Sequence, residues 1–304
     1  MLVASEVRDW LLDSDPSVRF QVLRDLTDAP EAVVAGERAR TAAEGWGRRL
    51  LEAQTPDGWW GGEGAADRWR YALYTLHLLQ QLGVDPAGER VRAAVAATRD
   101  RVTWGAEFGD NPFFEGEEEP CINGRVLLIG AYFGVASESL YRRLVDEQLD
   151  DGGWNCEAPD SVRGSFHTTF CVLEGLAEFE FRSGRRASEA RREGEEYLLR
   201  RGLLRSVSTG AVVDHRFTHS SFPNGSDYDL VRGLDYLRAT GRHADARVGE
   251  AVEIVRSQRR PDGRWPFVDP GLSHQRIVTE TGDDEGSRWN TLRGLRVLRW
   301  AEER

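Results

Sequence analysis

A short turn that recurs three times constrains the fold of this chain more than any other feature. It reads QTPDGWW at Gln54–Trp60, QLDDGGW at Gln148–Trp154 and, one residue longer, QRRPDGRW at Gln258–Trp265. In each copy a Gln ends a polar helical segment and Asp-Gly-x-Trp follows. Asp-Gly supplies a tight turn, the Trp can pack beneath it with its N–H on a carbonyl, and the Gln can bond backbone groups freed at the helix end. A degenerate copy, TWGAEFG, stands at Thr103–Gly109. This recurrence predicts a repeat architecture.

Two kinds of helical segment alternate along the chain, and strand signals are scarce. Six segments, here called inner helices, are broadly apolar at the helical period: Pro16–Leu26, Arg68–Gly83, Ile122–Gly134, Phe166–Phe179, Tyr228–Ala239 and Trp289–Ala301. Six more polar segments, here called outer helices, have a narrower apolar stripe: Ser5–Leu12, Arg38–Gln54, Ala87–Arg101, Glu138–Gln148, Ala187–Arg201 and Ala246–Gln258.

This alternation predicts an all-α chain of six helical hairpins. An array of equal hairpins either stays open as a solenoid or closes into a ring. Because the inner helices are more apolar and aromatic than the outer ones, we predict a closed α/α toroid, an (α/α)6 barrel, as a single domain over residues 1–304. The N-termini of its inner helices would gather at one end, around a central cavity.

Composition excludes some functions and suggests a compartment. The net charge of −11 argues against nucleic-acid binding, which needs a basic face. No stretch approaches the roughly 20 apolar residues that cross a bilayer, and the N-terminus lacks the features of a signal peptide. We therefore expect a cytoplasmic protein without a transmembrane segment, in which cysteines serve as ligands or nucleophiles more often than as disulfides.

Two cysteines and a histidine stand at or before the starts of inner helices. Cys121 lies in EEEPCINGR, and Cys156 and His167 lie in GGWNCEAPDSVRGSFHTTFCVLEGL. Thiolate and imidazole are the ligands that zinc prefers, and three of them with one open position are typical of a catalytic site. We predict that these three residues bind Zn²⁺, with Glu119 as a fourth ligand or a proton-transfer group. For Cys171, one helical turn after His167, simple packing in the core is the favoured interpretation.

A second pair of histidines, His215 and His219, has the spacing HxxxH. Phe217-Thr218 between them and Pro223 nearby indicate a loop rather than a helix, so we favour no metal role for this pair.

Aromatic and arginine residues near the inner-helix starts are candidates for substrate binding. Four aromatic side chains could line an apolar cavity and stabilise positive charge: Trp69, Phe166, Tyr228 and Trp289. Arg125 and Arg232 could meet an anionic group of a substrate. Packing in the core and pairing with carboxylates remain the alternatives for both sets.

The repeated turn resembles the motif of an α/α toroid superfamily that includes squalene-hopene cyclases, the terpene cyclase β domain and protein prenyltransferase β subunits. The resemblance covers nearly the whole chain and implies the toroid fold. In the prenyltransferase β subunits, an Asp-x-Cys pair and a His at the next inner helix hold zinc. Glu119-Pro120-Cys121 and the segment His167–Leu176, HTTFCVLEGL, are similar to these motifs, with Glu119 in place of the Asp.

Cys156 has no zinc-binding counterpart in the prenyltransferases and would be an added ligand. The lanthionine cyclases, another α/α toroid family, use Cys, Cys and His on zinc. Cys121, Cys156 and His167 resemble that set, although the flanking motifs of those enzymes are absent here.

The cyclase half of the superfamily implies a DxDD acid that protonates an alkene. Asp227-Tyr228-Asp229-Leu230 is the nearest segment here, with Leu230 in place of the last Asp. Asp229 falls where the protonating residue would be. Asp283-Asp284-Glu285, before the last inner helix, is acidic but lacks the spacing of that motif.

These observations lead to one main hypothesis and two alternatives. The main hypothesis is a zinc-dependent enzyme that acts on an apolar or isoprenoid-like small molecule, with zinc activating a nucleophile or polarising an oxygen and Glu119 or Asp229 handling protons. The first alternative is a metal-free, acid-initiated terpene-cyclase-like enzyme that uses Asp229. The second is a non-catalytic toroid that binds a lipid or a peptide and holds a structural zinc ion or none.

Overall fold

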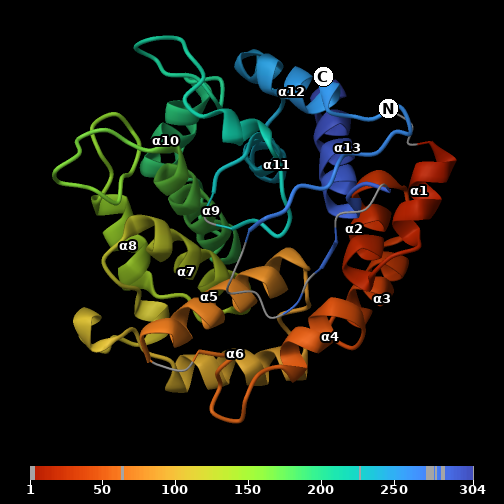
Figure 1. Ribbon diagram of the computed structural model, residues 1–304. Coiled ribbons are helices and arrows are strands. Elements are labelled where there is room, and N and C mark those ends of the chain that lie inside the picture. Colours follow the sequence, from red (N-terminus) through yellow and green to blue (C-terminus); the bar gives the residue numbers. More distant parts are fainter. Residues whose placement is uncertain are drawn as a thin grey trace. The chain divides into compact units, whose positions relative to one another are not determined.

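The computed structural model describes residues 4–62, 65–225, 227–271, 277, 279–281 and 285–303 (Figure 1). Over these residues the regular secondary structure is helical, and pairing between extended segments is limited to isolated β-bridges. The all-α prediction is therefore confirmed. None of the helices in the described ranges combines the length and the apolarity needed to cross a membrane.

Inner and outer helices alternate as predicted, which is the order that an α/α toroid requires. The inner helices are α2 (Pro16–Leu26), α5 (Ala65–Gln81), α7 (Pro120–Phe133), α9 (Phe166–Arg182), α11 (Leu230–Ala239) and α13 (Arg288–Glu302). The outer helices are α1 (Ser5–Leu12), α3 (Glu31–Arg40), α4 (Gly45–Glu52), α6 (Glu89–Arg101), α8 (Glu138–Asp146), α10 (Glu189–Leu199) and α12 (Gly249–Ser257). Four 3-10 turns join them: η1 (Ala106–Phe108), η2 (Phe113–Glu115), η3 (His215–Thr218) and η4 (Ala246–Val248). The closure of the hairpins into a ring stays a prediction.

One predicted outer helix, Arg38–Gln54, is not continuous: its first residues are the last turn of α3, which begins earlier than predicted, and its remainder contains α4. Gly45 begins α4 in the left-handed region, with φ of +57°. The Asp15 carboxylate lies against it and accepts a hydrogen bond from the backbone N–H of Trp46 at 2.8 Å. A β-carbon at Gly45 would lie 1.9 Å from Asp15 Oδ2. The break therefore depends on a residue far upstream, which the local periodicity of 38–54 does not reveal.

The chain divides into two compact units. Unit 1 contains Met1–Gly47, Leu198–Leu272 and Val278–Arg304, and unit 2 contains Arg48–Tyr197 and Ser273–Ile277. In unit 1, α13 packs against α2, α11 and α12. In unit 2, α7 packs against α5, α8 and α9. The prediction of a single domain stays a prediction.

The α7–α9 pair is the closest helix packing in unit 2, and the two helices lie side by side (Figure 1). Glycines permit this approach. A β-carbon at Gly124 would lie 2.5 Å from the carbonyl oxygen of Cys171, and one at Gly175 would lie 2.3 Å from that of Gly124. Because the two backbones touch, the first turns of α7 and α9 are held together, and the cysteine-bearing segments meet there.

The repeated turn forms the hydrogen bonds expected of it. In all three copies the indole N–H donates to the carbonyl ten residues earlier: Trp60 Nε1 to Leu50 O (2.8 Å), Trp154 Nε1 to Leu144 O (2.7 Å) and Trp265 Nε1 to Val255 O (2.9 Å). The degenerate copy differs, because Trp104 Nε1 donates forward to Phe113 O at 3.0 Å.

In the first two copies the Gln of the turn bonds both its own turn and a neighbouring segment. Gln148 Nε2 donates to the carbonyls of Gly152 and Ala190, each at 2.8 Å. Gln54 does the same with Gly58 and Ala94, at 3.1 and 3.0 Å. In these two copies the turn fastens one outer helix to the next, whereas Gln258 Nε2 of the third copy donates to Thr218 O in η3.

Candidate functional site

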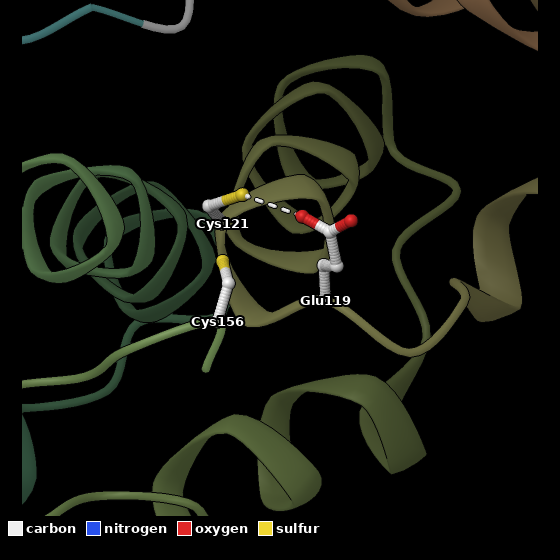
Figure 2. A group of neighbouring side chains, drawn as sticks. All are labelled: Glu119, Cys121 and Cys156. Atoms are coloured by element: carbon white, nitrogen blue, oxygen red, sulfur yellow. Dashed lines mark hydrogen bonds between the residues drawn. The ribbon is translucent and has the colours of Figure 1, made fainter. Parts of the chain in front are cut away.

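Three side chains that could hold a metal ion converge at the start of α7 in unit 2. Glu119, Cys121 and Cys156 each place one ligand atom within 4.8 Å of the other two (Figure 2). Glu119 is the N-cap residue of α7 and Cys121 lies in its first turn, while Cys156 comes from the loop that leads to α9. Figure 2 shows both sulfur atoms and the carboxylate turned toward one another. Glu119 is exposed and the two cysteines are half-buried.

A buried carboxylate and a buried amide shape the loop before α7. Glu117 accepts hydrogen bonds from the backbone N–H groups of Glu118 (2.6 Å) and Glu119 (2.7 Å). The side chain of Asn123 donates to Glu117 O at 2.9 Å and accepts from Glu117 N at 2.8 Å. Burial raises the pKa of the Glu117 carboxyl, and the two backbone bonds offset this in part. These contacts set the direction in which Glu119 leaves the loop.

The guanidinium of Arg143, on α8, also forms hydrogen bonds with the loop before α7. It donates to the carbonyl of Glu117 and, at 3.0 Å, to the carbonyl of Glu118. Backbone carbonyls that no helix bonds are thereby satisfied.

The loop that carries Cys156 is closed by its own side chains. Asn155 Nδ2 donates to Ser161 Oγ (2.9 Å) and to Arg163 O (2.8 Å). Ser165, the N-cap of α9, donates its backbone N–H to Trp154 O at 2.8 Å. Cys156 is thus placed beside the first turn of α9, where its Sγ lies 3.3 Å from Thr168 Oγ1.

The two thiols have different hydrogen-bond partners. Cys121 donates to Glu119 Oε2, with the sulfur 3.6 Å from the oxygen. Interaction with the neighbouring Cys121 side chain lowers the pKa of Cys156 to about 7 against the effect of burial, and the contact with Thr168 contributes to the lowering. The same contact between the sulfurs, together with burial and neighbouring negative charge, raises the pKa of Cys121. Cys156 is therefore the more readily ionised thiol of the pair.

His167, the third predicted ligand, lies in the first turn of α9 and is half-buried. Its ring nitrogens do not belong to the group of atoms that lie within 4.8 Å of one another. The neighbouring residue in the chain, Thr168, contacts Cys156. The role of His167 as a ligand stays a prediction, whereas Glu119 takes the third position in the group.

Below this group, Arg125 and Cys171 meet between α7 and α9. Both side chains are buried, and Arg125 Nη2 lies 3.5 Å from Cys171 Sγ. The burial of Cys171 agrees with the packing role expected for it. Arg125 lies one helical turn after Cys121, and its role toward a substrate stays a prediction.

The predicted aromatic residues of unit 2 pack against other rings. The ring of Trp69 lies 4.8 Å from that of Trp104, and Phe166 lies 6.0 Å from Tyr197, measured between centroids. Both predicted residues are buried.

In unit 1, Tyr228, Arg232 and Trp289 are likewise buried. Tyr228 donates its hydroxyl to Leu203 O at 3.0 Å, and Trp289 stacks on Phe222 at 3.9 Å. Arg232 donates to Asp227 O at 3.1 Å. These contacts are those of packed core residues, and a role in substrate binding stays a prediction for the whole set.

Asp229, the predicted acid, is the N-cap residue of α11. Its Oδ1 accepts from Arg232 N (2.8 Å) and from Ser220 Oγ (3.0 Å), and lies 3.6 Å from Arg293 Nη2. These contacts are those of a side chain that caps a helix. The acidic pair Asp283-Asp284 lies outside the described residues.

Sequence reasoning missed Glu280, a carboxylate at the start of α13. It accepts hydrogen bonds from Ser287 Oγ, Arg288 N (2.6 Å) and Trp289 N (3.2 Å). Burial raises the pKa of Glu280, and these bonds act in the opposite direction. Helix-capping signals could not identify it, because it lies seven residues before the Ser287 that caps α13 in the usual position.

His215 and His219 lie on an exposed turn, as expected. His219 Nδ1 lies 3.2 Å from His215 O, so the two residues follow a 3-10 turn rather than one face of an α-helix.

No known protein family and no curated protein matches the chain. Among solved structures, it is similar to the crystal structure of a protein from Actinoplanes, with 18% sequence identity, a TM-score of 0.45 and coverage of 95% of this chain and 90% of that one. It is also similar to the type II terpene cyclase MstE from Scytonema in its apo form, with 16% identity, a TM-score of 0.31 and coverage of 88% and 98%.

Proposed function

We propose that Glu119, Cys121 and Cys156 bind a zinc ion and that the protein is a zinc-dependent enzyme. The observation that carries the proposal is the meeting of two thiols and a carboxylate from two separate stretches, with their ligand atoms within 4.8 Å of one another. His167, in the first turn of α9, would supply a fourth ligand or leave that position to a substrate.

The donor set suits zinc. Zinc binds thiolates at about 2.3 Å and carboxylate oxygens at about 2.1 Å in a tetrahedron, so neighbouring ligand atoms in such a site lie roughly 3.5–4 Å apart. Side-chain rotation of Glu119, which is exposed, and of the half-buried cysteines can close the remaining distance. Two thiolates and a carboxylate also offset the charge of the ion.

The substrate class comes from the resemblance to the toroid superfamily, which implies an apolar or isoprenoid-like small molecule. Bound zinc would lower the pKa of a coordinated thiol or water, or polarise an oxygen. Glu119 is exposed at the N-cap of α7, so when it gives up its place on the ion to a substrate it could accept a proton from that bound group. Arg125, one turn further along α7, would add positive charge next to an anionic group.

Metal analysis of the purified protein tests the site directly. We expect one equivalent of zinc in the wild-type protein and its loss in Cys121→Ser and Cys156→Ser. Cys171→Ser is the matched control, because that thiol is buried beside Arg125 and lies outside the group. Protein that binds no metal after expression with zinc, and whose melting temperature is unchanged by a chelator, would contradict the proposal.

The number of protein ligands separates a catalytic ion from a structural one. Zinc X-ray absorption of the wild type and of His167→Ala would count sulfur and lighter ligands in each. Four protein ligands and no response to a bound molecule favour the alternative of a non-catalytic toroid that binds a lipid or a peptide. Mass spectrometry of co-purified small molecules would identify the substrate class.

The metal-free alternative depends on Asp229 acting as an acid. Its contacts with Arg232 N, Ser220 Oγ and Arg293 favour a capping role. Asp229→Asn keeps an oxygen for the cap and removes the acid. Once a substrate is known, retained turnover in this variant would eliminate the acid-cyclase alternative, and abolished turnover in a folded variant would support it.

A further inference from the structure

We propose that Cys121 and Cys156 form an oxidisable dithiol, which hydrogen peroxide converts into an intramolecular disulfide. The proposal goes beyond the proposed function, because the metal-free protein suffices for it. It concerns the same two sulfurs, so the experiment below separates the two ideas.

The two sulfur atoms are close and reachable. They lie within 4.8 Å of each other, and both residues are half-buried rather than enclosed. A disulfide needs about 2.05 Å between sulfurs, a change that rotation about χ1 can supply when the backbones are near enough. Cys156 lies in a loop rather than in a helix, so the restriction that a helix places on χ1 does not apply to it.

The hydrogen bonds around the pair distinguish the sulfur that reacts first. Ser165 Oγ donates to Thr168 Oγ1 at 2.9 Å, so the hydroxyl hydrogen of Thr168 is left for Cys156 Sγ at 3.3 Å. Cys121, in contrast, donates its own hydrogen to Glu119 Oε2. Cys156 is therefore placed to accept a hydrogen bond at the attacking sulfur, and Cys121 is placed to pass its proton to Glu119 in the second step.

The reaction balances with peroxide as the oxidant. The sulfur of Cys156 attacks one peroxide oxygen, the O–O bond breaks, and a sulfenic acid and one water molecule form. The sulfur of Cys121 then attacks that of Cys156, the S–O bond breaks, and the departing hydroxide takes up the Cys121 proton through Glu119 as a second water. Two thiols are oxidised and one peroxide is reduced to two waters.

Oxidation and metal binding exclude each other, because a disulfide leaves neither sulfur as a thiolate. If zinc occupies the group, each disulfide formed should release one ion. Exposure to peroxide would then lower the amount of zinc bound to the protein.

The third cysteine provides an internal control. Cys171 is 2% exposed and lies against Arg125, one turn along α9 from His167. Its side chain is shielded from peroxide in the folded protein. The proposal therefore predicts one specific linkage out of the three that three cysteines allow.

The test uses the full-length protein in two forms, zinc-loaded and chelator-treated, with graded hydrogen peroxide. We expect the chelator-treated wild type to lose about 2 Da in intact mass, reversibly with dithiothreitol, and peptide mapping to link Cys121 to Cys156. Cys171→Ser should behave as the wild type. Cys121→Ser should instead accumulate a sulfenic acid on Cys156 that dimedone traps.

The proposal is overturned if the folded protein keeps both thiols at peroxide concentrations that oxidise free cysteine, or if the linkage involves Cys171 or a second molecule. A Cys156→Ser variant that traps dimedone on Cys121 as fast as the wild type forms the disulfide would also overturn the assigned order. If the protein forms the disulfide but never binds zinc, the proposed zinc site is wrong and this inference stands. If the protein binds zinc but forms no disulfide once the zinc is removed, this inference is wrong and the proposed zinc site stands.

Discussion

Trp154 and Leu144 are joined by a hydrogen bond of 2.7 Å from the indole N–H to the backbone carbonyl near the end of α8. Trp154 is fully buried, and the same bond recurs at the other two copies of the turn. Each Trp thereby closes the C-terminal end of an outer helix, where carbonyls lack a partner within the helix. The turn thus stabilises the end of the preceding outer helix as well as reversing the direction of the chain.

Replacing this indole by a phenyl ring should destabilise the protein. Trp154→Phe leaves the Leu144 carbonyl buried without a partner and creates a small cavity, so we expect a loss of about 2–4 kcal/mol in the free energy of unfolding. Denaturant unfolding measures it. Trp59→Phe is the control, since Trp59 is only half-buried and stacks with Arg68 rather than bonding a helix end. An equal loss in both variants would contradict a special role for the turn.

The repeated turns and the positions of the helices could be predicted from the sequence, because each depends on residues close together in the chain. The Asp-Gly-x-Trp pattern specifies the turn, and the period of the apolar residues specifies the helices. The break between α3 and α4 could not be predicted, because it depends on Asp15 reaching Gly45 from another helix.

The sequence predicts which segments meet at the candidate site, but not how their side chains are oriented there. The motifs before α7 and α9 indicated that Cys121 and Cys156 should meet, and their ligand atoms do lie within 4.8 Å of each other. Glu119 completes the group, as Glu119-Pro120-Cys121 predicts, whereas the hydrogen bond from its backbone N–H to Glu117 is a contact that no sequence pattern indicates. The direction of the His167 ring depends on its rotamer, and periodicity assigns only a helix face.

The close approach of α7 and α9 makes Gly124 intolerant of any side chain. In Gly124→Ala the β-carbon would lie 2.5 Å from Cys171 O, so the helices must separate. We expect a loss of about 2–4 kcal/mol in the free energy of unfolding. Gly36→Ala, at an exposed position of α3 with nothing within 4 Å, should instead gain about 0.5–1 kcal/mol. Thermal unfolding of both variants checks the pair, and a stable Gly124→Ala would contradict the packing.

A buried charge cluster in unit 1 should make stability depend on pH. Asp235 pairs with Arg238 at 2.7 Å and with Arg296, which also pairs with Asp25 at 3.2 Å. Burial alone would raise the pKa of Asp235, but the two arginines outweigh it and hold the pKa below the ordinary value. A lowered folded-state pKa stabilises the protein above the unfolded pKa of about 3.9, and this contribution is lost as the pH falls through the folded value.

Asp235→Asn should therefore cost about 3–5 kcal/mol near neutral pH, because it leaves the buried arginines of the cluster with one carboxylate, Asp25, in place of two. The difference from the wild type should shrink as the pH falls below about 4. Urea unfolding across the pH range measures both effects. Glu253→Gln is the control, since Glu253 is 70% exposed and pairs with Arg256 at the surface. A difference that stays constant down to acid pH would contradict the assigned linkage.

Arg143 and Arg142 are neighbours on α8, but only Arg143 of the two bonds the loop before α7. Comparing their alanine variants therefore measures how much that contact contributes to zinc binding. Arg143 donates to the carbonyls of Glu117 and Glu118, whereas Arg142 pairs with Glu138 on its own helix. Because groups behind the ligands fix their orientation, Arg143→Ala should weaken zinc binding by about 10–100-fold. Arg142→Ala should leave the affinity unchanged. Competition with a chromophoric chelator measures both, and melting curves show whether either variant is unfolded. Equal affinities for the two folded variants would mean that the α7 loop holds its shape without Arg143.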